Sequence, residues 1–157
     1  MRHIAVYLLA GLSTATLAGQ FPYDVSADAN AEVQRAFIAA TTAHVPVLIF
    51  FGANWCEDCR VLDRALQERQ SAALLSRAFS VVKVDVGNFD RNLDLAKRFG
   101  NPIARGIPAV VVVSVNGELL YSTKAGELAD ARTMSASGIY DFFRRVSQVA
   151  AGAHRAP

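Results

Sequence analysis

Cysteine is scarce in this chain: Cys56 and Cys59 are the only two among its 157 residues. A zinc site would need these thiols together with His44 and His154, which stand at no recognisable ligand spacing, so we expect no metal. An excess of one charge is also lacking. The formal net charge is +2 and no cluster of lysine and arginine stands out, which argues against nucleic acid as a partner.

A long hydrophobic run is lacking as well. Residues 4–17 are almost wholly apolar or small, but a membrane-spanning helix needs roughly 20 such residues. Arg2 and His3 make a short basic start, and Thr16-Leu17-Ala18 places small residues at the −3 and −1 positions of a cleavage site. We therefore expect a cleaved export signal peptide over residues 1–18, with an uncleaved N-terminal membrane anchor as the alternative. The protein would then be periplasmic or otherwise exported.

The rest of the chain suffices for one domain with a sizeable core, since 52% of all residues are apolar. We expect this domain over 19–150 and a loose tail over 151–157. Apolar runs predict strands at 47–51, 81–86, 109–113 and 118–123, the last two joined by a hairpin turn at Asn116-Gly117. Helical spacing predicts a helix from a cap at Ser26 or Asp28 to about residue 42, others at 56–69, 73–79 and 137–149, and one ending before Gly100. Residues 21–25 are expected to form a short edge strand.

The two cysteines stand at the junction between a buried strand and a helix. The apolar run 47–51 is followed by Gly52-Ala53-Asn54, and a helical pattern begins at the cysteines. The unpaired N–H groups and the positive dipole end of that helix favour a thiolate at Cys56, and Cys59 lies one turn further on, close enough for a disulfide. A purely structural bond is the alternative, but closing so short a loop contributes only about 2 kcal/mol, against about 4 kcal/mol for a loop spanning a domain. The spacing therefore favours a redox-active Cys56–Cys59 pair.

The order of these motifs resembles the thioredoxin superfamily, and within it the exported bacterial thioredoxin-like proteins with a Trp-Cys-x-x-Cys active site. The match covers residues 50–126. Residues 51–59 are similar to the family's active-site segment, 83–86 to the strand that follows, 105–108 to the loop with its cis-proline and 116–118 to its hairpin. The resemblance implies an α/β thioredoxin-like fold, in which a central mixed β-sheet is flanked by helices, with an extra N-terminal helix.

The resemblance also implies roles for single residues. Cys56 would be the attacking thiolate, and Cys59 the thiol that resolves the mixed disulfide. Trp55 would shield the site, Ile107 would pair its backbone with an extended substrate segment, and Pro108, in a cis peptide bond, would lie against the sulfurs. For Trp55 and Pro108, plain packing and plain turn formation are the alternatives.

Two features depart from thioredoxin itself. Thioredoxin has a buried aspartate six residues before its first active-site cysteine, where this chain has Phe50, so the proton relay for the resolving cysteine must come from Glu57, Asp58 or water. The central dipeptide is Glu-Asp instead of Gly-Pro. Gly126 stands where the family has a glycine of the substrate groove, although a turn glycine is an equal alternative. Lys83 can approach the redox site or simply be solvated.

The acidic pair inside the motif bears on the direction of electron transfer. Two carboxylates in the first helical turn stabilise the helix, but they repel and so disfavour a neighbouring thiolate. A less stabilised thiolate makes a more reducing couple, so we expect a reductase or isomerase and not a strong oxidant. If Glu57 and Asp58 point into solvent, this effect is small.

Together these patterns predict an exported thiol–disulfide oxidoreductase that needs no cofactor. Its substrates would be disulfides of exported proteins, and a membrane thiol reductase would supply its electrons in an oxidising compartment. A reductant dedicated to cytochrome c maturation or to metal-site cysteines is one alternative, although the chain has no C-x-x-C-H haem-attachment motif. A redox-inert module that uses the thioredoxin fold to bind a partner is the other.

Overall fold

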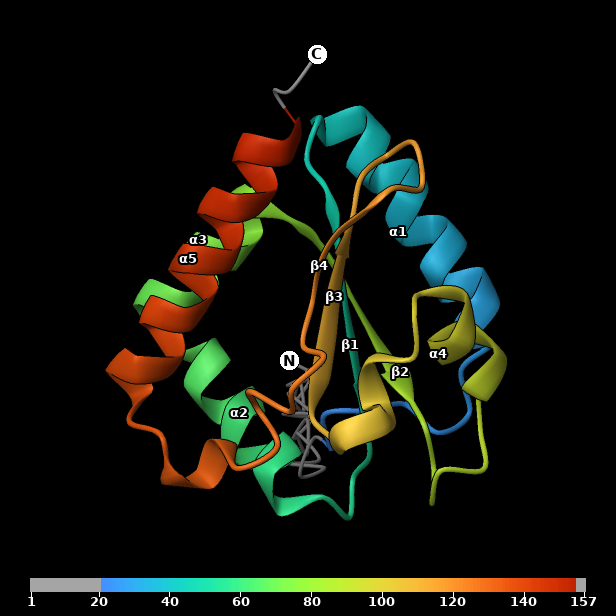
Figure 1. Cartoon of the computed structure of the whole chain (residues 1–157), viewed down its shortest axis with the longest axis vertical. Coiled ribbons are helices and arrows are strands. Elements are labelled where there is room, and N and C mark those ends of the chain that lie inside the picture. The colour runs from blue at the N-terminus through green and yellow to red at the C-terminus, as the bar shows by residue number, and fades with distance from the viewer. Residues whose placement is uncertain (1–20, 155–157) are drawn as a thin grey trace, which may run out of the picture.

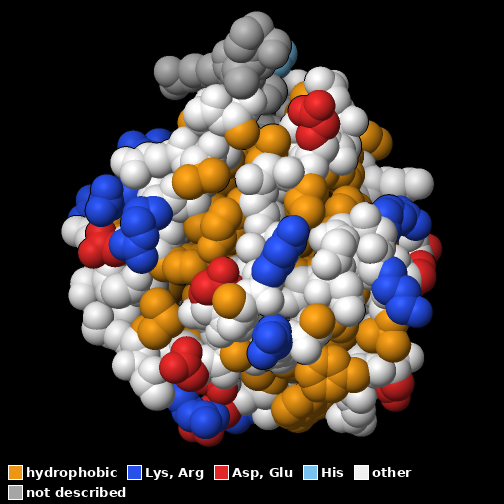
Figure 2. Space-filling model, viewed as in Figure 1, with side chains coloured by type: hydrophobic (Ala, Val, Ile, Leu, Met, Phe, Trp, Pro, Cys, Tyr) orange, Lys and Arg blue, Asp and Glu red, His pale blue; other side chains and the backbone are white. Residues whose placement is uncertain are grey.

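The computed structural model describes residues 21–154 (Figure 1). The expected signal peptide at 1–18 and the last residues, 155–157, lie outside this range. Within it, no helix is both long and apolar enough to cross a membrane. On the face shown in Figure 2, basic and acidic side chains of the described residues lie mostly in small groups of both signs near the edges, with a few single ones among hydrophobic side chains near the middle.

A four-stranded mixed β-sheet forms the centre of the fold, in the order β2-β1-β3-β4. Its strands are β1 (Val47–Gly52), β2 (Ser80–Asp85), β3 (Ala109–Val113) and β4 (Leu119–Ser122). β1 runs parallel to β2 and antiparallel to β3, and β3 pairs antiparallel with β4. Every residue of β1 and β3 is buried, because these central strands are covered on both faces. The four strands expected from the apolar runs are thus confirmed.

Helices cover both faces of the sheet (Figure 1). α1 (Ala29–Ala43) and α4 (Leu93–Arg98) lie on one face, and α2 (Glu57–Gln67), α3 (Arg69–Ala78) and α5 (Ala136–His154) lie on the other. Two short 3-10 helices, η1 (Pro102–Arg105) and η2 (Ala131–Thr133), lie in the connections. Side chains of β1 alternate between the two layers: Phe51 belongs to the core beneath α1, and Phe50 to the core beneath α2 and α5. This arrangement confirms the thioredoxin-like fold with an extra N-terminal helix.

The segment before α1 differs from its prediction. Residues 21–25 form no strand. The backbone of Tyr23 is hydrogen-bonded to the side chain of Asn54 instead of to a neighbouring strand. The backbone N–H of Tyr23 donates to Oδ1 of Asn54 at 3.0 Å, and its carbonyl accepts from Nδ2 of Asn54 at 2.8 Å. The helix that follows begins at a predicted cap, since the carboxylate of Asp28 accepts a hydrogen bond from the N–H of Ala31 at 3.1 Å.

The C-terminal helix also differs from its prediction. α5 continues to His154, through residues that were expected to belong to the loose tail. Its buried face includes Ala150, which is 1% exposed, whereas Val149 is 51% exposed. Ala150 lies four residues beyond the buried Val146 and so falls on the same face of the helix. The contact between α5 and the core therefore extends by one more helical turn.

Candidate active site

Cys56 and Cys59 lie where β1 passes into α2, at the bottom of Figure 1. Cys56 caps the helix: its Sγ accepts a hydrogen bond from the N–H of Cys59 at 3.1 Å, one of the groups that a helix leaves unpaired. The two residues form a disulfide, with their Cα atoms 5.2 Å apart. Cys56 is 4% exposed and Cys59 is 1% exposed, so Cys56 is the outer partner. The N–H donor and the helix dipole both favour a thiolate at Cys56 once the bond is reduced.

The loop before β3 closes the site from the opposite side. The Ile107–Pro108 peptide bond is cis, as the resemblance implied. The carbonyl oxygen of Ile107 lies 3.6 Å from Sγ of Cys56, so this loop contacts the disulfide. The fold therefore brings together the disulfide and the Ile107–Pro108 loop, which hold four of the predicted site residues. The pairing of Ile107 with a substrate stays a prediction.

Gly126 lies beside the same loop. Its φ of 79° is in the left-handed region, and a Cβ there would come within 3.1 Å of the carbonyl oxygen of Arg105. Both the backbone conformation and the close approach of the loop therefore favour glycine at this position. The predicted role in a substrate groove is not tested by this geometry.

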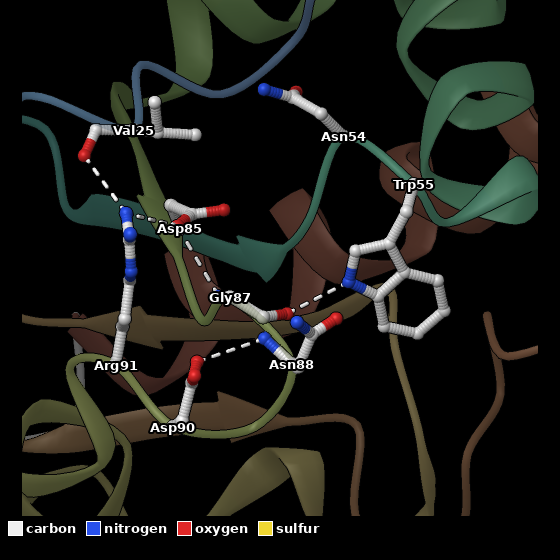
Figure 3. Close-up of a pocket in the computed structure, with 8 residues that line it drawn as sticks. All are labelled: Val25, Asn54, Trp55, Asp85, Gly87, Asn88, Asp90 and Arg91. Atoms are coloured by element: carbon white, nitrogen blue, oxygen red, sulfur yellow. Dashed lines mark hydrogen bonds and ion pairs between the residues drawn. The ribbon is translucent and has the colours of Figure 1, made fainter.

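Trp55 is the exposed aromatic residue of the site. Its side chain is 54% exposed, and its indole N–H donates to the carbonyl of Gly87 at 2.8 Å, across a pocket of about 220 Å³ (Figure 3). The indole packs against Phe89, with the ring centroids 6.3 Å apart. Phe89, in the loop after β2, is 42% exposed and adopts a left-handed φ of 61°, so the two rings form an exposed aromatic pair next to Cys56 in the chain through Trp55.

The two acidic residues of the motif have different surroundings. The side chain of Glu57 is 64% exposed and its carboxylate lies 3.9 Å from the guanidinium of Arg132, whereas the side chain of Asp58 is 9% exposed and bound to η2. Oδ1 of Asp58 accepts from the backbone N–H of Arg132 at 2.8 Å, and Oδ2 accepts from its guanidinium at 3.0 Å. Arg132 therefore balances the charge of Asp58, and the acidic pair does not act on Cys56 as two free carboxylates.

Asp58→Ala is expected to lower the free energy of unfolding by about 1–3 kcal/mol, because it leaves two donors of Arg132 without their acceptor. Urea unfolding followed by circular dichroism measures the change. Glu57→Ala is the matched control, since it removes the same charge from the same helical turn but from an exposed side chain, and should change stability by about 0.5 kcal/mol or less. Equal losses in the two variants would contradict the assigned contact.

A buried carboxylate lies one helical turn beyond Cys59, and the sequence alone did not indicate it. Asp63 is 8% exposed, forms an ion pair with Lys83 on β2 and accepts a hydrogen bond from Gln67 at 2.7 Å. Lys83 is thus not simply solvated. Asp63 stands four residues after Cys59 and so on the same face of α2, which is the signal that could have identified it.

Tyr23 is a second residue near the site that the sequence alone did not indicate. It is 5% exposed and belongs to the core cluster that contains both cysteines. Burial raises the pKa of Tyr23 above its usual value, and the carboxylates of Asp63 and Asp85 raise it further. Asp85 is itself buried at the end of β2, where Arg91 approaches it to 3.7 Å. No sequence pattern marks Tyr23, because its position depends on a contact with Asn54.

Comparisons with known proteins identify relatives of this chain. Residues 28–114 match a family described as thioredoxin-like. The crystal structure of a disulphide isomerase from Xylella fastidiosa Temecula1 has 54% sequence identity and a TM-score of 0.80, covering 82% of this chain and 98% of that one. Thioredoxin 1 of Chlorobaculum tepidum is 37% identical over 82 residues, which are 52% of this chain and 72% of that protein. The oxidised C-terminal domain of DsbD from Neisseria meningitidis shares the fold at 20% identity, with a TM-score of 0.57 over 76% of this chain and 96% of that one.

A paired C-x-x-C disulfide at the start of a helix, next to a cis-proline loop, defines a disulfide oxidoreductase. The chain belongs to the thioredoxin-like family.

Proposed function

We propose that this protein is an exported thiol–disulfide oxidoreductase that reduces or isomerises disulfides in other exported proteins. The observation that carries the proposal is the Cys56–Cys59 disulfide, held at the start of α2 and against the cis Ile107–Pro108 bond. The 54% identity with a protein described as a disulphide isomerase supports the choice of reaction.

The reaction takes place in two thiol–disulfide exchange steps. The thiolate of reduced Cys56 attacks one sulfur of a substrate disulfide, forms a mixed disulfide and releases the other sulfur as a thiolate. Cys59 then attacks Sγ of Cys56, which re-forms the bond within the protein and releases the second substrate thiolate. Two electrons pass to the substrate, and its two thiolates take up protons from solvent. The N–H of Cys59, 3.1 Å from Sγ of Cys56, stabilises the thiolate that begins the reaction.

Substrate segments would bind over Cys56, the less deeply buried of the two cysteines. Trp55 and Phe89 provide an aromatic surface on one side, and the loop containing Ile107 provides backbone groups on the other. Gly126 lies next to that loop and has no side chain to fill the space beside it. This geometry suits an extended peptide segment that carries a cysteine.

The supply of electrons follows from the proposed compartment. The predicted signal peptide would place the protein outside the cytoplasm, where thiols are oxidised. A protein that reduces disulfides there needs a continuing source of electrons, and we propose a membrane thiol reductase as that donor. No cofactor is required, because the two cysteines exchange electrons directly with thiols.

We expect a reduction potential near or below about −200 mV, on the reducing side of the family. Arg132, Lys83 and Arg91 each balance part of the charge of one carboxylate, those of Asp58, Asp63 and Asp85. We expect the negative charge that remains on the two carboxylates behind Cys59, Asp63 and Asp85, to disfavour a thiolate on the reduced sulfurs. Equilibration with glutathione buffers, followed by thiol alkylation and gel shift, measures the potential.

Asp63→Asn should raise that potential by tens of millivolts, since about 30 mV corresponds to about 1.4 kcal/mol for a two-electron couple. Glu57→Gln, which neutralises an exposed carboxylate, is the control. A wild-type value near about −120 mV would contradict the reductase assignment, and a disulfide that does not exchange with glutathione would contradict the proposed function.

A further inference from the structure

Two hydrogen bonds join the backbone of Tyr23 to the active-site loop. Both of its backbone polar groups bond to the side chain of Asn54, at 3.0 and 2.8 Å, and Asn54 directly precedes Trp55 and Cys56 in the chain. The guanidinium of Arg91 donates a hydrogen bond to the carbonyl of Val25 at 3.1 Å, which gives the same segment a further contact (Figure 3). These contacts hold the backbone of residues 23–25 beneath the active-site loop, and burial holds the Tyr23 side chain in the core.

The phenol of Tyr23 lies near the inner sulfur of the site, without a hydrogen bond to it in the disulfide form that the structure describes. A Cβ built on Gly52 would overlap the hydroxyl oxygen of Tyr23 and would lie 2.9 Å from Sγ of Cys59. The hydroxyl and the sulfur thus border the same point, and the glycine at position 52 leaves the space between them open. No polar side chain enters from Phe50, whose ring packs against Phe143 at a centroid distance of 5.6 Å.

The charges around Tyr23 determine what its hydroxyl can do. Asp63 faces it from α2 with Lys83 as its ion-pair partner, and Asp85 faces it from the end of β2 with Arg91 nearby. Arg60, on the first turn of α2, is directed to the carbonyl of Asn54 at 2.7 Å. Burial and the two carboxylates raise the pKa of Tyr23, so that the phenol keeps its proton at neutral pH and acts as a hydrogen-bond donor.

We propose that Tyr23 is a positioning residue for the resolving step, in which its hydroxyl donates a hydrogen bond to Sγ of Cys59 after the disulfide opens. This inference rests on the roles proposed above for Cys56 and Cys59. Cys59 loses its proton to solvent, and its thiolate, held by the phenol, attacks Sγ of Cys56. The substrate sulfur leaves with the electron pair of the broken bond and takes up a proton from solvent. Tyr23 supplies the polar contact that the side chain at position 50 does not.

The reaction of the reduced protein with 5,5′-dithiobis(2-nitrobenzoate) separates the two cysteines in one experiment. Attack by Cys56 releases the first thionitrobenzoate anion, and attack by Cys59 on the resulting mixed disulfide releases the second. Stopped-flow absorbance across a range of pH gives both rates for the wild type and for Tyr23→Phe. Far-UV circular dichroism and urea unfolding establish that the variant is folded.

Tyr23→Phe is expected to change only the second release. Loss of a hydrogen bond to a charged sulfur should move the midpoint of the pH profile of the second phase up by about one unit. With a Brønsted coefficient of about 0.4–0.5, part of the lost thiolate is offset by greater nucleophilicity, so the second phase slows about threefold at neutral pH. Tyr121→Phe removes the hydroxyl of a half-buried tyrosine on β4, and neither phase should change in it.

Four results would overturn the inference or the function on which it rests. A second phase in Tyr23→Phe with the wild-type pH profile would refute the role of the hydroxyl, and equal slowing of both phases would show a general loosening of the site. Absence of the first phase in the wild type would instead refute the exchange function itself. Tyr23→3-fluorotyrosine, which makes the phenol a stronger donor, should move the midpoint of the second phase to lower pH, and a shift upward would also refute the proposal.

Discussion

Cys56→Ser is expected to abolish catalysed insulin reduction by dithiothreitol, leaving only the uncatalysed rate. A serine hydroxyl does not ionise near neutral pH, so the N–H of Cys59 and the dipole of α2 have no thiolate to stabilise. The mixed disulfide with insulin then cannot form. Turbidity from the precipitating insulin B chain, recorded at pH 7, measures the rate.

Cys59→Ser provides the comparison for this result. It should also stop turnover, but its Cys56 still attacks the substrate, so the variant accumulates as a mixed disulfide with insulin. The wild-type rate in Cys56→Ser would contradict the assignment of the attacking residue. Accumulation of a mixed disulfide in Cys56→Ser and not in Cys59→Ser would reverse the two roles.

Gly52→Ala should have the largest effect on stability, a loss of about 1–3 kcal/mol or more in the free energy of unfolding. The added Cβ would overlap the ring and hydroxyl of Tyr23 and would press on Sγ of Cys59. β1 is buried along its whole length between β2 and β3, so it cannot move away to relieve the overlap. Urea unfolding measures the loss.

Gly152→Ala is the matched control, because a Cβ at that position of α5 would meet no atom within 4 Å. It should be neutral or slightly stabilising, since alanine favours a helix over glycine by about 1 kcal/mol. A double-mutant cycle then tests the cause: in a Tyr23→Ala background, Gly52→Ala should lose much of its cost, with a coupling of about 1 kcal/mol or more. Additive effects would contradict the contact between Gly52 and Tyr23.

The sequence predicted those parts of the structure that depend on local patterns. The run 47–51 and the run 109–113 are apolar without interruption because β1 and β3 are covered on both faces, and this signal is strong. The C-x-x-C motif at the start of a helix indicated the disulfide and its chemistry. The cis bond before Pro108 followed from the resemblance to the family alone, because the residues themselves do not fix it.

The parts that could not be predicted depend on contacts between distant residues. Asp58 is bound by Arg132, 74 positions further along the chain, so its burial and its balanced charge are invisible in the motif. Tyr23 is positioned by Asn54, 31 positions away, through a side chain that replaces a strand partner. The sequence therefore identified the sulfur chemistry correctly, but it assigned the electrostatic influence to the pair inside the motif and missed the groups behind Cys59.

The most direct test of the account is a search for mixed disulfides formed by the full chain carrying Cys59→Ser in a bacterium with a periplasm. Alkylated periplasmic and membrane fractions are separated with and without dithiothreitol, and the adducts are mapped by mass spectrometry. We expect adducts joined through Cys56 to exported proteins and to a membrane thiol reductase, and we expect none of them in the Cys56→Ser/Cys59→Ser double variant. Recovery of cytochrome-maturation proteins alone would show a dedicated reductant, and no adduct above the double variant would contradict the central claim that this site exchanges disulfides with exported partners.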